Sequence, residues 1–213
     1  MHTRRLVPEL LDSIKASDPR AIRSRRDLRL INAFLGNERW IVRQLAAQRR
    51  LSEGVIELGA GEGHLTRRIF NSLPMTRATG LDLAPRPDNL PASVGWVQGD
   101  FSQTLLETEG DACIGNLILH HFDAAGLVSL GALLQRFRLL IFSEPLRAPL
   151  PLALAHLVLP LAGEVTRHDM PASIRSGFRK GELPLLLALD PSLWKWEEKE
   201  SRRGSLRLIA SRT

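Results

Sequence analysis

The sequence predicts an α/β protein with a mostly parallel sheet, helices on both faces of the sheet and a helical extension at the N-terminus. Two observations support this prediction. Short apolar runs alternate with helical patterns between residues 54 and 143, and a glycine-rich turn follows the first of these runs. Strands that alternate with helices indicate parallel strands joined by right-handed crossovers. A chain of 213 residues, 44% of them hydrophobic, is long enough for one such domain with modest extensions.

The first fifty residues predict helices. Asp18 followed by Pro19 is typical of a helix N-cap with proline in the first turn, and Gly36-Asn37 is typical of a helix end. A second helix is expected from residue 38 to residue 50. We therefore expect residues 1–50 to form a helical cap and residues 51–213 to form the main domain.

The main domain is predicted to contain five parallel strands, two connecting helices and a closing hairpin. One run, at 112–119, is almost wholly apolar, as expected for a strand that is buried on both faces. The predicted strands are 55–58, 78–83, 94–98, 112–119 and 139–143, the helices are 64–73 and 123–137, and the hairpin strands are 194–199 and 206–211.

Composition excludes several classes of protein. The single cysteine, Cys113, excludes an internal disulfide framework and a cysteine-based zinc site, and no metal site is expected. No apolar stretch follows Arg4 and Arg5, so a secretory signal is not expected. The most apolar segment, 148–163, is interrupted by prolines and is too short to span a bilayer. We expect a cytoplasmic protein.

The positive charge lies in the N-terminal part of the chain. Residues 1–50 contain twelve Arg or Lys and five Asp or Glu, a net charge of +7, whereas the whole chain carries +6. Such a segment can attract nucleic acid. Its basic residues are interleaved with acids and lack an aromatic platform, however, so we favour solvent-facing helix surfaces over a nucleic-acid partner.

The glycine-rich turn is the central functional motif. Gly59, Gly61 and Gly63 lack a Cβ, so a ligand could approach the backbone that follows the first strand. His64 stands where the nicotinamide fingerprint needs a small residue, and the lysine of a phosphate-binding P-loop is absent. A tight structural turn is the alternative interpretation.

Polar and aromatic residues follow the other predicted strands. Asp82 lies 23 residues after Gly59, where a carboxylate can accept hydrogen bonds from ribose hydroxyls. Asp100 and Phe101 offer a carboxylate for an exocyclic amine and an aromatic face for a purine, although Asp100 could equally cap a helix. Asn116 lies in an apolar strand, where a polar side chain needs a partner.

Together these motifs resemble the class I S-adenosylmethionine-dependent methyltransferases, most closely the branch that methylates small molecules. The resemblance covers about residues 50–145 and rests on five segments: Glu57-Leu58-Gly59-Ala60-Gly61-Glu62-Gly63, Leu81-Asp82-Leu83, Gln98-Gly99-Asp100-Phe101, Asn116-Leu117-Ile118-Leu119-His120-His121-Phe122 and Ser143-Glu144-Pro145. It implies a Rossmann-like seven-stranded sheet and the cofactor S-adenosyl-L-methionine. The implied cofactor-binding residues are Glu57, Gly59, Ala60, Gly61, Gly63, Asp82, Leu83, Asp100, Phe101 and Asn116. Asn116 stands where an acid is frequent in this family, and its amide oxygen can still bind the methionine ammonium group.

The resemblance places the transferred methyl group near His120 and His121, and either histidine could act as a general base. The alternative is that one of them packs at a strand end. Glu144 could also be a base, or could belong to the turn at Pro145. The segment Thr166-Arg167-His168-Asp169 is expected in a solvated loop, although its His-Asp pair could orient an acceptor.

The predicted function is transfer of a methyl group to a small, apolar or aromatic acceptor by in-line displacement. The apolar stretches 150–162 and 183–189 could enclose such a molecule, although 150–162 could equally be a core helix. Two alternatives stay open: an RNA or DNA methyltransferase that uses the basic extension, and a non-catalytic cofactor-binding scaffold. Against the first, Asn116-Leu117-Ile118-Leu119 lacks the prolines of amino-methylating nucleic-acid enzymes, and Cys113 is expected to be buried.

Overall fold

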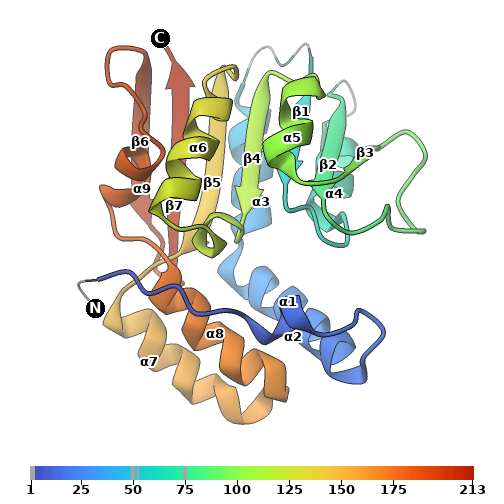
Figure 1. The fold of residues 1–213 in the computed structure, drawn as a ribbon, viewed down its shortest axis with the longest axis vertical. Coiled ribbons are helices and arrows are strands. Elements are labelled where there is room, and N and C mark those ends of the chain that lie inside the picture. Colours follow the sequence, from blue (N-terminus) through green and yellow to red (C-terminus); the bar gives the residue numbers. More distant parts are fainter. Residues whose placement is uncertain (1–2, 49–50, 52, 74–75) are drawn as a thin grey trace.

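A seven-stranded sheet forms the centre of the molecule (Figure 1). The structure is a computed structural model that describes residues 3–48, 51, 53–73 and 76–213. The strand order is β3-β2-β1-β4-β5-β7-β6. Strand β7 runs in the direction opposite to the other six strands and is antiparallel to both of its neighbours, β5 and β6. The strands are β1 (Val55–Leu58), β2 (Ala78–Asp82), β3 (Gly95–Gln98), β4 (Ala112–Asn116), β5 (Leu139–Pro145), β6 (Trp194–Glu200) and β7 (Ser205–Arg212). The predicted Rossmann-like, mostly parallel sheet is confirmed.

Helices cover both faces of the sheet and also form a layer beyond its carboxyl ends. In Figure 1, α5, α6 and α9 lie in front of the sheet and α3 and α4 behind it, while α1, α2, α7 and α8 lie below. The helices are α1 (Leu10–Ser13), α2 (Pro19–Leu35), α3 (Asn37–Ala46), α4 (His64–Ser72), α5 (Phe101–Thr104), α6 (Ala124–Leu134), α7 (Pro149–Val158), α8 (Glu164–Ser176) and α9 (Glu182–Leu186). Short 3₁₀ turns are η1 (Leu105–Glu107), η2 (Leu119–His121) and η3 (Leu159–Leu161).

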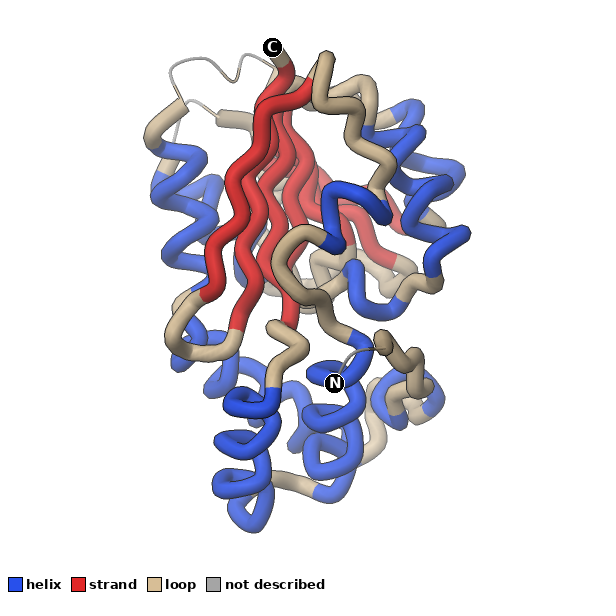
Figure 2. Tube along the Cα trace, turned by 90° about the vertical axis from the view of Figure 1, so that its left-hand side faces the viewer, coloured by secondary structure: helices blue, strands red, loops and turns tan. Residues whose placement is uncertain are grey.

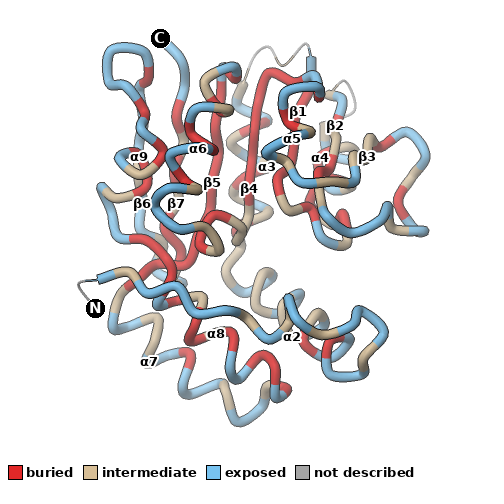
Figure 3. The backbone as a smooth tube through the Cα atoms, in the orientation of Figure 1, coloured by how far each residue is buried: buried red, intermediate tan, exposed pale blue. Residues whose placement is uncertain are grey.

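The two faces of the sheet bury alternate residues of the same strands. Leu140 and Phe142 of β5 pack into the core with α6 and α9, whereas Leu139 and Ile141 pack into the core with α3 and α4. This follows from the two-residue period of a strand. It also explains why the central strands are continuous apolar runs, which appear buried along their length in Figure 3.

The predicted N-terminal helices form, and they pack against two different parts of the molecule. Asp18 caps α2, since its carboxylate accepts the Arg20 N–H at 2.8 Å, and Gly36 ends that helix with φ 68°. Helix α2 packs on α8, whereas Ile41 and Leu45 of α3 are buried against the sheet. Helix α3 ends at Ala46, and residues 49 and 50 of its predicted range lie outside the described residues. The domain division at residue 50 stays a prediction.

The fourth strand is shorter than predicted. It ends at Asn116, because Leu117 adopts φ 60° and its N–H bonds to the Ser143 carbonyl at 2.9 Å. Residues 119–121, predicted partly as strand, form the turn η2. The backbone therefore leaves the sheet just before the two histidines.

Residues 166–169 do not lie in a loop. They belong to α8, which continues through Pro171. Proline removes one backbone hydrogen bond from a helix, so α8 forms despite the loss of that bond. The buried contacts of α8, which include Val165, Thr166 and Ala172, keep the segment helical.

The two apolar stretches expected to enclose an acceptor are placed differently. Leu183, Leu187 and Leu189 lie in the main core beside Trp194, and therefore do not line a pocket. Helix α7, from the stretch 150–162, buries Ala155 but leaves most of its large side chains exposed, so the core-helix interpretation is also wrong. No helix in the described part of the chain is long and apolar enough to cross a membrane.

Candidate active site

The glycine-rich turn after β1 has the open backbone that the sequence predicted. Gly59, Gly61 and Gly63 have φ values of 62°, 54° and 69°, which residues other than glycine rarely adopt. A Cβ on Gly59 would lie 2.5 Å from the Ile118 side chain, whereas a Cβ on Gly61 would meet nothing within 4 Å. The turn is therefore packed against the segment after β4 at one glycine and open at another.

Asp82 connects this turn to the end of β2. Its two carboxylate oxygens accept the N–H groups of Gly61 at 2.7 Å and Ala84 at 2.8 Å. Leu83, which lies between Asp82 and Ala84 in the sequence, is 74% exposed. A charged acceptor and an exposed apolar surface thus lie side by side at the carboxyl edge of the sheet.

Helix α2 is attached to the glycine-rich turn through Glu62. Arg29 donates to the Glu62 carboxylate at 2.7 Å, and Arg25 lies 3.6 Å from it. Two arginines of the N-terminal extension, which was expected to present solvent-facing helix surfaces, therefore pair with an acid of the turn.

Glu57, predicted to bind the cofactor, is buried and bonded to α4. The Thr66 hydroxyl donates to its carboxylate. Burial raises the pKa of Glu57 to about 8, although the Thr66 hydrogen bond acts in the opposite direction. Glu57 is thus mostly protonated at neutral pH and links β1 to the helix after the turn.

Asp100 and Phe101 stand at the end of β3. Asp100 caps α5 by accepting the Ser102 N–H at 2.8 Å. The Phe101 ring contacts the Phe122 ring edge-on, with centroids 5.2 Å apart. The helix-cap interpretation of Asp100 is confirmed, and its contact with a purine stays a prediction.

Asn116 presents an unsatisfied acceptor at the end of β4. Its side-chain nitrogen donates to the Asn32 amide oxygen of α2 at 3.4 Å. Its own side-chain oxygen is buried and has no hydrogen-bond partner among the described residues. Such an oxygen costs free energy unless a ligand or water supplies a donor, which points to a bound cation or amine.

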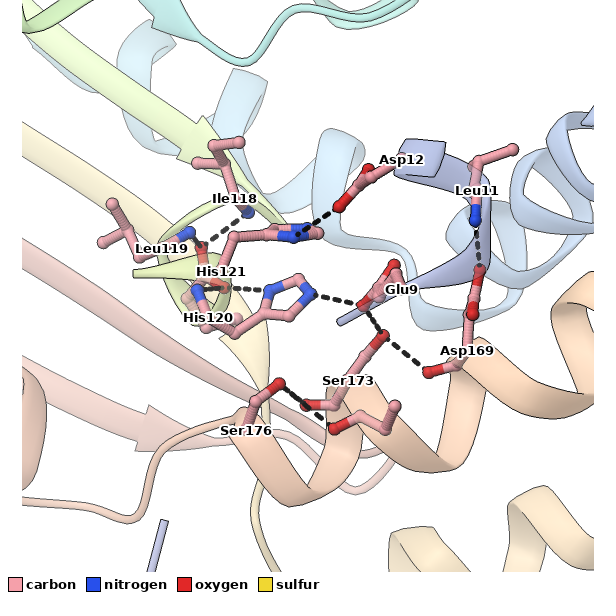
Figure 4. Close-up of polar contacts among 12 residues, drawn as sticks. Glu9, Leu11, Asp12, Ile118, Leu119, His120, His121, Asp169, Ser173 and Ser176 are labelled. Atoms are coloured by element: carbon pink, nitrogen blue, oxygen red, sulfur yellow. Dashed lines mark hydrogen bonds and ion pairs between the residues drawn. The ribbon is translucent and has the colours of Figure 1, made fainter. Parts of the chain in front are cut away.

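Beyond Asn116, the buried carboxylate of Glu144 organises the turn η2. One oxygen accepts the N–H groups of Ile118 at 3.0 Å and Leu119 at 2.9 Å, and the other accepts from His120 Nδ1 at 2.9 Å (Figure 4). His120 Nε2 faces Glu9 Oε1 at 3.3 Å. Burial by itself lowers the pKa of His120, but its hydrogen bonds to Glu144 and Glu9 outweigh burial and raise that pKa to about 9.

His121 occupies a different environment. Its side chain is 27% exposed, and Nδ1 lies 3.4 Å from the Asp12 carboxylate. The hydrogen bond from His121 lowers the pKa of Asp12 despite partial burial. The two neighbouring histidines therefore differ in exposure: His120 is buried between the carboxylates of Glu144 and Glu9, whereas His121 is partly exposed beside Asp12.

The two other acids that reach these histidines, Glu9 and Asp12, come from the N-terminal segment, residues 3–13, which crosses α8. Asp169 of α8 accepts the N–H groups of Leu10 at 2.8 Å and Leu11 at 3.0 Å (Figure 4). Arg4 donates to the His120 carbonyl at 3.0 Å. Sequence analysis missed Glu9 and Asp12, because no spacing relates them to residues more than one hundred positions away.

Glu9, His120 and His121 also place one potential metal ligand each within 4.8 Å of one another. Both nitrogens of His120 already face carboxylates, which accounts for the cluster as a hydrogen-bonded network. The absence of a metal site stays a prediction.

The sequence and the fold can now be compared with those of known proteins. No family model and no curated protein matches the sequence. Among solved structures, the plantazolicin methyltransferase BamL, in complex with a triazolic desmethylPZN analog and SAH, has a TM-score of 0.72 at 10% identity, over 95% of this chain and 92% of that one. An O-methyltransferase family protein from Burkholderia thailandensis has a TM-score of 0.65 at 18% identity, over 100% of this chain and 65% of that one.

The chain has the class I methyltransferase fold. A third structure, the pyocyanin biosynthetic protein PhzM, agrees less well, with a TM-score of 0.57 at 19% identity over 92% of this chain and 60% of that one. Within the methyltransferase fold of this chain, the predicted residues at the ends of β1, β2 and β4 are joined by direct contacts. The Asp82–Gly61 hydrogen bond and the packing of Ile118 on Gly59 make these connections.

The His120 network predicts a pH dependence of stability. Because the pKa of His120 is raised from 6.5 to about 9 on folding, its contribution is complete below about pH 6.5 and is lost as the pH rises through 9. The free energy of unfolding, measured by urea denaturation at pH 6, 7.5 and 9.5, should therefore fall across this range. Glu9→Gln should weaken the dependence, while Glu197→Gln on the edge strand should leave it unchanged. An equal slope in Glu9→Gln and wild type would show that this network does not control the titration.

Proposed function

We propose that the protein is an S-adenosylmethionine-dependent methyltransferase that acts on a small molecule. The observation that supports this best is the open glycine-rich turn with Asp82 on one side and the unpartnered Asn116 oxygen on the other. When bound, the cofactor supplies an electrophilic methyl group on a sulfonium. The solved structures with this fold that contain SAH support the same ligand.

Each part of the site suits one part of that cofactor. Asp82 would accept hydrogen bonds from the ribose hydroxyls, and Leu83 would cover the adenine with its exposed side chain. Asn116 would accept a hydrogen bond from the methionine ammonium group through the oxygen that lacks a partner. Gly61 leaves room for the ligand against the backbone. Asp100 and Phe101 would border the adenine from the end of β3.

The protein's contribution to the reaction is alignment of the acceptor and, for a hydroxyl acceptor, removal of its proton. We assign the proton acceptor to His121, because Asp12 faces its Nδ1 and leaves Nε2 for the acceptor. His120 is a poorer candidate: with a pKa of about 9 it already carries a proton at neutral pH. Its role would be to hold η2 and the N-terminal segment together.

The proteins of similar fold support a small acceptor. They include a plantazolicin methyltransferase with azole-containing analogs, a pyocyanin biosynthetic protein and an O-methyltransferase family protein. The paired arginines of α2 weaken the case for nucleic acid, because Arg25 and Arg29 are engaged with Glu62. Methylation of RNA or DNA with a steep dependence on salt would contradict a small acceptor.

The cofactor assignment predicts that Asp82→Ala weakens binding of S-adenosylmethionine. Loss of one or two hydrogen bonds to a charged group, each worth roughly 1.5–3 kcal/mol, should raise Kd at least tenfold in isothermal calorimetry. Glu197→Ala, on the exposed edge strand, is the matched control and should bind as wild type. Equal affinities for Asp82→Ala and wild type would remove Asp82 from the site.

The base assignment predicts a change in the pH–rate profile with a hydroxyl acceptor. The wild-type rate should fall as the pH is lowered, because a general base acts only in its unprotonated form, and His121→Ala should flatten this limb. Asp12→Asn should lower kcat and displace the limb, while His156→Ala, on the exposed face of α7, should change neither. A profile that is unaltered in His121→Ala would refute the base assignment and leave the cofactor assignment intact.

The absence of a metal site predicts that methyl transfer survives chelation. Displacement at a sulfonium needs no Lewis acid, and His120 is held by carboxylates on both nitrogens. Dialysis against EDTA should leave kcat unchanged, and metal analysis should find no stoichiometric ion. Loss of activity that zinc or manganese restores would instead assign Glu9, His120 and His121 as ligands.

A further inference from the structure

The large apolar side chains of α7 and η3 form a stripe that faces solvent. The exposed fractions are 64% for Leu150, 42% for Leu154, 74% for Leu157, 46% for Val158 and 82% for Leu161. Their spacing of four, three, one and three residues places them on one helical face. Ala155, on the opposite face, is 1% exposed. A surface helix usually turns its apolar face inward, so this stripe lacks the partner that its composition implies.

Arginines adjoin both ends of the stripe. Arg23 of α2 lies at the C-terminal end of the stripe, with its guanidinium 3.5 Å from the Leu161 carbonyl. The β6–β7 turn lies at the start of the stripe, because a Cβ on Gly204 would be 3.2 Å from Pro151. Figure 2 shows the strands in red above the helical layer, and the β6–β7 turn carries the exposed Arg202 and Arg203. Residues 148–163 themselves contain no charged side chain, and the exposed Glu164 follows them. The stripe is therefore apolar along its length. Its border is basic at the β6–β7 turn, whereas at the η3 end Arg23 lies with the acids Glu164 and Asp27, which accepts the Gly163 N–H at 2.8 Å.

This combination fits a lipid surface better than a protein. Protein interfaces concentrate their binding energy in Trp, Tyr and Arg, and leucine is under-represented among such residues. Helices that lie in a bilayer interface instead insert an aliphatic face, and neighbouring arginines contact anionic headgroups. The helix is too short to span a bilayer, so it would lie parallel to the surface.

We propose that α7 and η3 dock the protein onto an anionic lipid membrane. Leu157 and Leu161 would insert between the acyl chains, and Arg23 and Arg202 would contact headgroup phosphates. Helix α7 belongs to the helical layer beyond the carboxyl ends of the strands (Figure 1). The turn η2, which carries His121, contacts α8 of that layer. Docking would therefore bring the site toward acceptors dissolved in the bilayer, a consequence that rests on the proposed function.

Co-sedimentation with vesicles tests the docking without any methyl acceptor. Wild-type protein should bind vesicles of phosphatidylcholine with about one third phosphatidylglycerol, and bind pure phosphatidylcholine more weakly. Leu157→Glu/Leu161→Glu should lower the partition coefficient at least tenfold, because two exposed leucines lose their burial in lipid. Arg202→Ala should lower it about fivefold, and only on the anionic vesicles. Leu185→Glu is the matched control, since Leu185 is 78% exposed on α9 and should bind as wild type.

Three outcomes would overturn the proposal. The wild type could fail to bind the anionic vesicles, or the double variant could bind as wild type while both keep the same melting temperature. Light scattering could also show a wild-type dimer that the double variant dissociates, in which case the stripe is covered by a second copy of the chain. Calorimetry with S-adenosylmethionine separates this test from the proposed function, because cofactor binding should be equal in all of these variants.

Discussion

The carboxylate of Glu144 is the interaction on which the rest of the site depends. It is fully buried at the end of β5, and it accepts backbone N–H groups from the turn after β4 as well as the ring N–H of His120. A buried carboxylate is stable only when hydrogen bonds replace its water, and η2 supplies these bonds. The turn in turn places Ile118 on Gly59 and presents His120 to Glu9. One acid thereby sets the position of the glycine-rich turn, of both histidines and of the N-terminal segment.

A second constraint acts between the first two strands. The Asp82 carboxylate fixes the glycine-rich turn through the Gly61 N–H, so the groups that would hold the ribose and the methionine of a cofactor cannot move independently. The Asn116 oxygen, by contrast, has no hydrogen-bond partner among the described residues, and neither has the hydroxyl of Ser143, which pairs with Asn116 across β4 and β5. Because buried polar atoms usually have a partner, a ligand or water that donates to the Asn116 oxygen would stabilise this edge of the sheet. Rigid donors around one open acceptor are what preorganised binding requires.

The end of the molecule beyond the carboxyl edge of the sheet combines two kinds of surface. Its inner side is polar and charged, where the N-terminal segment meets η2 and α8 through Glu9, Asp12 and Asp169. Its outer side, on α7, is apolar and rimmed by arginine. Both an apolar acceptor and the proposed lipid surface would require apolar side chains at this end of the molecule. The polar inner side would hold the reacting atoms, and the apolar outer side would meet the medium that contains the acceptor.

Much of the fold was determined by local sequence. The alternation of apolar runs with helical patterns predicted the parallel sheet and the closing hairpin, because buried strands and amphipathic helices each have their own period. The turn at Gly59, Gly61 and Gly63 was predictable because only glycine adopts those backbone angles freely. The strand-end positions of Asp82 and Asp100 followed from the same pattern, since strand length and turn position are local properties.

Other features were decided by the tertiary structure. Residues 166–169 were expected in a solvated loop, yet the packing of α8 against its neighbours keeps them helical, and the helix continues through Pro171. The apolar composition of α7 signalled burial, but which side of a helix faces the core depends on the elements packed beside it. Glu9 and Asp12 could not be associated with His120 and His121, because their pairing joins segments more than one hundred residues apart. Sequence determines what a segment can form, and long-range packing and charge pairing decide which residues it meets.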